Sequence, residues 1–163
     1  MKNITDQYSH KGINFKLTWI PGEYYDKYSP ITQVYGFCFD NKNRLLTIKN
    51  NYWKCFMVPG GSPENNETPI ETLVRELDEE VNITVKDINY LGVQKVEGDN
   101  KIRYQLRFAC RIDKLNSRKT DPCDGIIHRR YFVDPLKYGE LSLWGEIGDA
   151  ITQSAMEKLK IKS

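Results

Sequence analysis

The sequence contains few of the residues that build structural metal sites. Its 163 residues include four cysteines and two histidines, and no two cysteines form a Cys-x-x-Cys pair. This spacing does not favour a zinc site of the standard kinds. Cys38 and Cys110 stand in apolar, strand-like runs, where reduced cysteine packs as a small hydrophobic residue. The first 12 residues also lack the apolar core of a signal peptide. Together these features predict a reduced, cytoplasmic protein.

A strong charge of one sign and long apolar runs are also missing. Lys and Arg number 24 against 22 Asp and Glu, which gives a net charge of +2. Such a balance does not favour nucleic acid as a partner, although it does not exclude one. No apolar run approaches the roughly 20 residues that cross a bilayer, so we expect no membrane association. The length fits one domain, 1–163, and leaves both a monomer and a homodimer open.

Seven segments have the alternating or continuous apolar character of β-strands. They cover 13–20, 33–39, 44–49, 53–58, 88–96, 102–112 and 128–133. Helical spacing marks two further segments, 68–81 and about 146–159. This order lacks the regular alternation of strand and helix that a doubly wound sheet requires. It favours the α/β class in the form of a mixed sheet with helices packed against it.

The segment after the Pro59-Gly60-Gly61 turn carries clear helix signals. Thr68 and Glu71 form a capping box around Pro69, which suits the first helical position. One apolar stripe follows at helical spacing: Ile70, Leu73, Val74, Leu77 and Val81. We expect the helix to end near Asn82, because three β-branched residues come next.

Three glutamates share the opposite side of this helix. Glu76, Glu79 and Glu80 are three and four positions apart, so their carboxylates gather on one arc. On a solvated helix this crowding costs only roughly 0.2–0.5 kcal/mol per pair, and a solvent-facing acidic surface is the ordinary explanation. The alternative is a divalent cation such as Mg²⁺, which prefers oxygen ligands. A backbone carbonyl of the glycine turn could add a ligand, because glycine lets the backbone approach closely.

The residues around these glutamates form a longer pattern. It runs Gly61-x5-Glu67-x7-Arg75-Glu76-Leu77-x-Glu79-Glu80-x-Asn82-Ile83. This pattern resembles the Nudix box, G-x5-E-x7-R-E-U-x-E-E-x-G-U, where U is an aliphatic residue. Eight of the nine specified positions agree, and only Asn82 departs, because it stands where the family has glycine. Asparagine is the best non-glycine residue for a left-handed helix end, so the departure should leave the acidic residues undisturbed.

The resemblance implies the fold and the activity of that family. The expected fold is a Nudix fold, in which a mixed β-sheet is sandwiched between α-helices. The box would occupy 61–83, and residues 1–30 would add an N-terminal strand and a tyrosine-rich loop. The implied reaction is the Mg-dependent hydrolysis of a diphosphate bond in a nucleoside diphosphate linked to another moiety, of the nucleotide sugar, NTP or dinucleotide type.

The same resemblance implies roles for single residues. The metal ligands would be three carboxylates and one backbone carbonyl: Glu76, Glu79, Glu80 and Gly60. Mg²⁺ is the implied ion, with Mn²⁺ as an alternative. Arg75 and Glu67 would pair and hold the helix against the loop. We favour Glu76 as the base that accepts a proton from the attacking water. The alternative candidates for this base come from later segments: Glu97, Asp121 and Asp124.

Residues that bind the substrate are less clearly indicated. Arg103 and Arg107 lie on one side of the 102–112 strand and could meet phosphates, although a solvated or helix-covered face is the simpler explanation. Trp53, just before the glycine turn, could stack on a base or pack in the core. The proline that marks ADP-ribose hydrolases is absent from its place near 98–100.

Two other functions fit the resemblance. One is a Nudix-like nucleotide-binding regulatory module without catalysis, and the other is an RNA 5′-end pyrophosphohydrolase. Regulatory modules of this kind typically lose glutamates from the box, whereas all of them are present here. This favours an enzyme, and the expected partner is a small-molecule nucleotide diphosphate.

Overall fold

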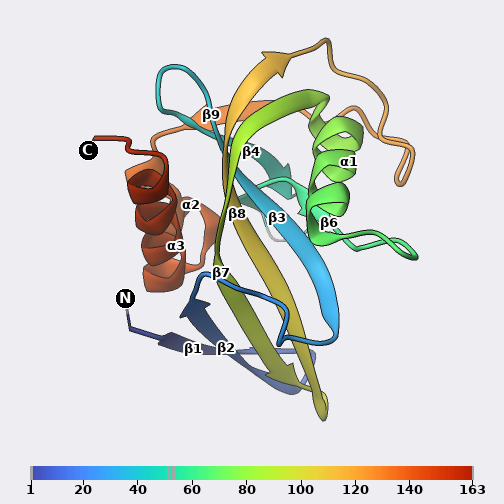
Figure 1. Ribbon diagram of the computed structural model, residues 1–163. Coiled ribbons are helices and arrows are strands. Elements are labelled where there is room, and N and C mark those ends of the chain that lie inside the picture. The colour runs from blue at the N-terminus through green and yellow to red at the C-terminus, as the bar shows by residue number, and fades with distance from the viewer. Residues whose placement is uncertain (1, 51, 53, 163) are drawn as a thin grey trace.

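The computed structural model describes residues 2–50, 52 and 54–162, whose strands form one nine-stranded mixed sheet (Figure 1). Along the sheet the strand order is β1-β2-β7-β8-β3-β4-β5, while β6 pairs with β3 and β9 pairs with β4. β3 and β8 run parallel, and the other pairs are antiparallel. The strands are β1 (Ile4–His10), β2 (Ile13–Pro21), β3 (Ile31–Phe39), β4 (Leu45–Asn50), β5 (Cys55–Met57), β6 (Gly60–Gly61), β7 (Ile83–Gly98), β8 (Lys101–Leu115) and β9 (Arg130–Val133).

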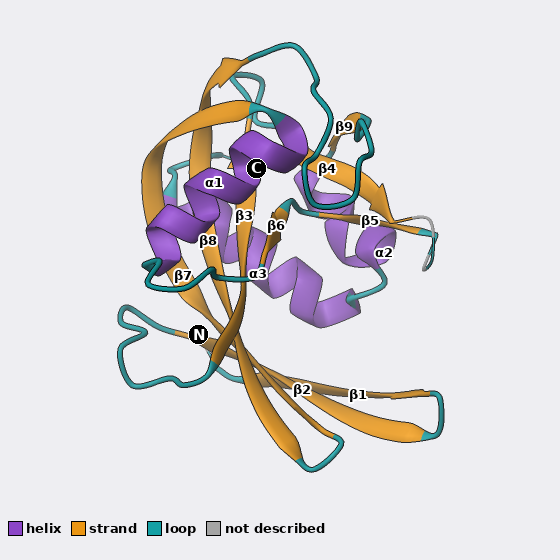
Figure 2. Cartoon of the chain, turned by 90° about the vertical axis from the view of Figure 1, so that its right-hand side faces the viewer, coloured by secondary structure: helices purple, strands orange, loops and turns teal. Residues whose placement is uncertain are grey.

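Helices cover both faces of the sheet, as Figures 1 and 2 show. They are α1 (Pro69–Val81), α2 (Tyr138–Ser142) and α3 (Gly145–Lys158), with a short 3-10 helix at Pro135–Lys137 before α2. α1 lies on one face, and α2 and α3 lie on the other. This arrangement confirms the predicted mixed sheet between helices. No helix of the described residues is long and apolar enough to cross a bilayer.

The central strand β3 supplies both halves of the core. Val34 and Cys38 belong to the cluster under α1, whereas Phe37 and Phe39 belong to the cluster under α3. Successive side chains of a strand point to opposite faces, so a strand that is covered on both faces consists of a nearly continuous apolar run. This explains why the apolar run at 33–39 predicts the strand correctly.

α1 begins and ends where the sequence predicts. The Thr68 hydroxyl accepts a hydrogen bond from the Glu71 N–H at 3.3 Å, and Glu71 accepts one from the Thr68 N–H at 2.8 Å. This capping box is therefore confirmed. Asn82 takes the left-handed conformation, with φ 46° and ψ 59°. The predicted apolar stripe is wrong at two positions, because Ile70 and Val74 are 43% and 48% exposed.

Several elements differ from the sequence prediction in their bounds. β1 pairs with β2 along its whole length, but most of its side chains are exposed, so it lacks the apolar alternation that predicts a strand. β7 begins at Ile83, directly after α1, and not at 88. β9 begins at Arg130 and not at 128, which leaves His128 in a loop. The short helix α2 has no counterpart in the prediction.

Candidate active site

Arg75 is the centre of the hydrogen bonds that hold α1 against the preceding loop. Its Nε and Nη2 donate to the two carboxylate oxygens of Glu67, at 2.7 and 3.0 Å. Nη1 donates to Glu76 Oε1 and Glu79 Oε2, each at 3.0 Å, and Nη2 also donates to the Ser62 carbonyl. The hydrogen bonds from Arg75 are the main reason that the pKa of Glu67 falls to about 2. One side chain therefore fixes the loop and two of the three glutamates in one arrangement.

Glu80 contacts the glycine turn and is the most strongly perturbed of the three glutamates. Its Oε2 accepts a hydrogen bond from the Gly60 N–H at 2.9 Å. Burial raises the pKa of Glu80 to about 8, and the negative charges of Glu76, Asp121 and Asp124 act in the same direction. Burial also raises the pKa of Glu76. These carboxylates therefore repel one another at close range.

The two glycines of the turn are required by close contacts. Gly60 has a φ of +148°, and a Cβ atom there would lie 2.1 Å from the Val34 carbonyl oxygen. A Cβ atom on Gly61 would lie 2.3 Å from Glu76 Oε1. A side chain at Gly60 would thus collide with β3, and one at Gly61 would collide with Glu76 of α1. Gly60 contacts Glu80 through its N–H, and a role for its carbonyl as a metal ligand stays a prediction.

The loop between β8 and β9 brings further polar side chains to Glu80, and Figure 2 shows this loop beside α1. Asp121 is 7% exposed, and its Oδ1 accepts a hydrogen bond from the Cys123 N–H at 2.8 Å. His128 Nε2 lies 3.4 Å from Asp121 Oδ2 and 3.0 Å from Asp124 Oδ2. Ligand atoms of Glu80, Asp121 and His128 all lie within 4.8 Å of one another.

Two of these loop residues are candidates from the sequence, and His128 is not. Asp121 and Asp124 are candidates as late acids, whereas His128 falls inside a predicted strand. No common ligand spacing links Asp121 to His128. His128 comes close to Glu80 because the β8–β9 loop packs beside α1. This is a tertiary contact that no local sequence pattern indicates.

A cavity of about 360 Å³ opens beside these carboxylates. Its lining includes the ionisable side chains of Glu80, Asp124, His128 and Lys49. Aromatic and apolar side chains complete the lining: Tyr35, Ile48, Met57, Val58 and Ile126. Such a mixture can hold a flat organic group next to a charged phosphate chain.

Arg107 has a different environment from the one that the sequence suggests. It is fully buried, and its guanidinium carbon lies 4.6 and 5.0 Å from the ring centroids of Tyr35 and Trp144. It donates hydrogen bonds to Gln94 and Gln105, and burial lowers its pKa to about 10. Because no part of Arg107 is exposed, its contact with phosphate stays a prediction.

Other candidate residues lie away from Glu80. Arg103 pairs with Val96, and Glu97 pairs with Ile102, near the closed end of the β7–β8 hairpin. This end of the hairpin lies at the bottom of Figure 1. Glu97 forms an ion pair with Lys95 at 2.7 Å. Of the three late acids, the structure therefore brings Asp121 and Asp124 to the glutamates and leaves Glu97 elsewhere. Trp53 lies outside the described residues.

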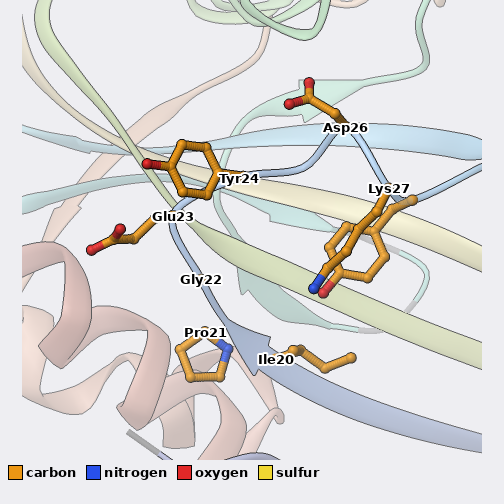
Figure 3. Close-up of a pocket in the computed structure, with 8 residues that line it drawn as sticks. Ile20, Pro21, Gly22, Glu23, Tyr24, Asp26 and Lys27 are labelled. Atoms are coloured by element: carbon orange, nitrogen blue, oxygen red, sulfur yellow. The ribbon is translucent and has the colours of Figure 1, made fainter.

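A second cavity, of about 390 Å³, lies at the tyrosine-rich loop between β2 and β3 (Figure 3). Its lining includes Glu23, Tyr24 and Lys27. Tyr24 is 74% exposed, whereas Tyr25 packs against Tyr90 with ring centroids 5.1 Å apart. The lining of this cavity does not include the carboxylates of α1.

Fold and site together define a class of α/β protein in which a glutamate-rich helix, held by one arginine, faces a glycine turn. The family model described as the NUDIX domain matches residues 30–139. This match spans more than half of the chain, and the chain therefore belongs to the Nudix family.

Individual relatives are similar over different lengths. The ADP-ribose pyrophosphatase of Methanocaldococcus jannaschii is 47% identical over 55 residues, which are 33% of this chain and 32% of that protein. The chain thus matches about a third of that relative's length. Among solved structures, the Bacillus subtilis pyrophosphohydrolase BsRppH has a TM-score of 0.66 at 20% identity, over 95% of this chain and 96% of that one. A C. elegans Ap4A hydrolase has a TM-score of 0.58 at 14% identity, over 80% and 99%. At these identities, the solved structures show a shared fold.

Proposed function

We propose that this protein is a Nudix pyrophosphohydrolase, which cleaves a diphosphate bond in a nucleoside diphosphate linked to another moiety. The observation that carries the proposal is the gathering of carboxylates from α1 and the β8–β9 loop beside one cavity. Arg75 adds support, because its hydrogen bonds to Glu76 and Glu79 hold two of those carboxylates in place.

The donor set fits a hard divalent cation, and Mg²⁺ is the proposed ion. Glu76, Glu79 and Glu80 would hold it, since Mg²⁺ prefers oxygen ligands and usually keeps several waters. The raised pKa values of Glu76 and Glu80 support the fit, because each carboxylate would gain from a positive charge nearby. When bound, the ion would neutralise phosphate oxygens and lower the pKa of a water molecule.

Glu76 is the proposed acceptor for the proton of the attacking water. Burial moves its pKa above the ordinary range, and a carboxylate with a raised pKa accepts a proton more readily near neutral pH. Its Oε1 is held by Arg75 Nη1 at 3.0 Å, which fixes the orientation of the group. Asp121 and Asp124 are the alternatives in the later loop, since the charges of both reach Glu80.

The cavity supports a nucleotide as the substrate class. Tyr35, Ile48 and Val58 offer an aromatic and apolar surface on which a base can stack or pack. The phosphates would then lie at the carboxylates. An ADP-ribose pyrophosphatase, a pyrophosphohydrolase and an Ap4A hydrolase are among the similar proteins, so the proposal is restricted to the diphosphate bond. The cytoplasmic location and the monomeric or dimeric state stay predictions.

The test is incubation of the tag-free protein with Mg²⁺ and single substrates in ¹⁸O-enriched water. The panel contains a nucleotide sugar, ADP-ribose, a dinucleoside polyphosphate, an NTP and capped RNA. We expect one class to give two phosphate-containing products, with ¹⁸O on only one of them, as mass spectrometry will show. EDTA should stop the reaction. Nucleotide binding without hydrolysis of any substrate would instead favour a regulatory module.

A further inference from the structure

His128 brings a nitrogen atom into a cluster that otherwise offers only oxygen. Its Nε2 is buried and has no hydrogen-bond partner, although Asp124 Oδ2 and Asp121 Oδ2 lie 3.0 and 3.4 Å away. These contacts therefore have the distance of a hydrogen bond without its geometry. A buried, unpartnered ring nitrogen is uncommon in proteins and needs an explanation.

We propose that Glu80, Asp121 and His128 form a mixed nitrogen–oxygen site for a divalent transition-metal ion. This inference rests on the proposed function in that Glu80 also belongs to the proposed magnesium site. The two remaining ligands come from the β8–β9 loop, outside the 61–83 box. In this site, the β8–β9 loop supplies two ligands in addition to the carboxylates on α1.

The distances suit a shared ion. Two ligand atoms of one ion are at most about 4.0–4.4 Å apart, which is twice the usual metal–ligand distance and is reached only when they lie on opposite sides of the ion. The three ligand atoms all lie within 4.8 Å of one another, so movements of a few tenths of an ångström would bring them to one ion. Side-chain rotations within ordinary rotamer wells supply shifts of that size.

The hydrogen bonds of the two carboxylates leave one oxygen of each for the ion. Glu80 Oε2 accepts from the Gly60 N–H, and Asp121 Oδ1 accepts from the Cys123 N–H. These contacts fix both carboxylates through backbone groups. The Oδ2 atom of Asp121 is then the one that faces His128, as expected where backbone hydrogen bonds orient metal ligands.

The surrounding charge also favours a cation. Asp124 adds a further carboxylate beside the three ligands, because its Oδ2 lies 3.0 Å from His128 Nε2. Arg75 is engaged by Glu67, Glu76 and Glu79. Lys49 lines the same cavity, but its side chain is exposed. A bound cation would therefore offset the repulsion among Glu80, Asp121 and Asp124, which Arg75 does not neutralise.

The imidazole determines which ions the site prefers. Mg²⁺ takes oxygen ligands almost exclusively, whereas imidazole suits later divalent metals. Affinity for a site of this kind rises from Mn²⁺ to Co²⁺. We therefore expect Co²⁺ to bind here in the presence of excess Mg²⁺. The competing interpretation is an ion pair, in which protonated His128 clamps the loop through Asp121 and Asp124.

The chain offers a matched control, because its two histidines are His10 and His128. His10 lies on β1, opposite Ile13. β1 is the first strand of the sheet order, four places from β3, with which the glycine turn pairs. The experiment is pulsed EPR of the tag-free protein with one equivalent of Mn²⁺, which detects a ¹⁴N nucleus bound to the ion. A Co²⁺ titration in excess Mg²⁺ measures the affinity.

We expect the ¹⁴N coupling in the wild type and in His10→Gln, and its loss in His128→Gln. His128→Gln should also weaken Co²⁺ binding at least about tenfold. Circular dichroism checks that each variant folds. If His128→Gln fails to fold, Asp121→Asn takes its place, and the same tenfold weakening of Co²⁺ binding is expected.

Each result bears on one proposal. Bound Mn²⁺ without ¹⁴N coupling in the wild type, or coupling that survives His128→Gln, would overturn the site and leave the ion pair. Hydrolysis with Mg²⁺ alone, combined with missing ¹⁴N coupling, would keep the proposed function and reject the site. Coupling without hydrolysis of any substrate would keep the site and reject the proposed function.

Discussion

Glu67 and Arg75 face each other across the turn that precedes α1, and two parallel hydrogen bonds of 2.7 and 3.0 Å join them. A planar guanidinium is needed for this contact, because lysine presents only a single charged nitrogen. The pair links the loop to the helix that carries the glutamates. A change at either residue should therefore affect stability and turnover together.

Arg75→Lys tests this link. We expect it to lower the free energy of unfolding by about 1–3 kcal/mol and turnover by at least about tenfold, because the glutamates lose their fixed positions. Urea denaturation and steady-state kinetics are the measurements. Arg44→Lys is the control, since Arg44 forms a similar pair with Asp40, at 2.7 Å, in an exposed turn. Equal effects of the two substitutions would show that Arg75 has no special role.

The glutamates of α1 give the most direct prediction for the reaction. Glu79→Gln and Glu80→Gln should each lower kcat by at least about 100-fold, because each removes a charged ligand from the proposed ion. Asp78→Asn is the control on the same helix. Asp78 pairs with Lys119 at 2.6 Å, with its side chain 52% exposed. The measurement is the initial rate of hydrolysis at saturating Mg²⁺. Rates near the wild-type value in both glutamine variants would contradict the proposed site.

The parts of the fold that sequence predicts correctly are those with local causes. Thr68 and Glu71 cap the helix that contains them, and Asn82 ends it through its own backbone conformation. The spacing of Glu76 and Glu80 places both on one arc of that helix. None of these features depends on a distant part of the chain, so a short pattern is enough to predict them.

The parts that sequence does not predict depend on long-range contacts. His128 reaches Glu80 only because the β8–β9 loop lies beside α1. Arg107 alternates with apolar residues as a solvated arginine would, and yet Tyr35 and Trp144 enclose it. Trp144 lies 37 positions further along the chain, which no periodicity connects to β8.

Glu80 predicts how the stability of the protein in EDTA depends on pH. Its pKa in the folded protein is about 8, above the ordinary value of 4.5, so the folded state binds this proton more tightly than the unfolded chain does. The resulting stabilisation is fully present below about pH 4.5 and is lost as the pH rises toward 8. Urea denaturation should show a loss on the order of 3 kcal/mol between pH 5 and pH 8. Glu80→Gln should remove most of this slope.

The pKa of Glu67 is shifted in the opposite direction from that of Glu80, so Glu67 serves as the comparison. Its folded-state pKa is about 2, below the ordinary value of 4.5, so its stabilisation is present above about pH 4.5 and is lost as the pH falls toward 2. Glu67→Gln should therefore change how the free energy of unfolding depends on pH below about pH 4.5. It should leave the dependence between pH 5 and pH 8 as in the wild type. A slope that persists in Glu80→Gln would show that another group causes it.

Asn82 allows the departure from the family pattern to be tested. Glycine adopts the left-handed conformation without steric cost, but Asn82→Gly also removes the hydrogen bond from Asn82 Nδ2 to the Ser117 carbonyl, at 2.6 Å. These effects oppose each other, so we expect a change of less than about 1 kcal/mol in the free energy of unfolding and less than about twofold in turnover. Asn82→Val should cost about 1–3 kcal/mol, because a β-branched residue is strained at this φ. A tenfold change of turnover in Asn82→Gly, at unchanged stability, would mean that Asn82 takes part in the reaction and does not merely end the helix.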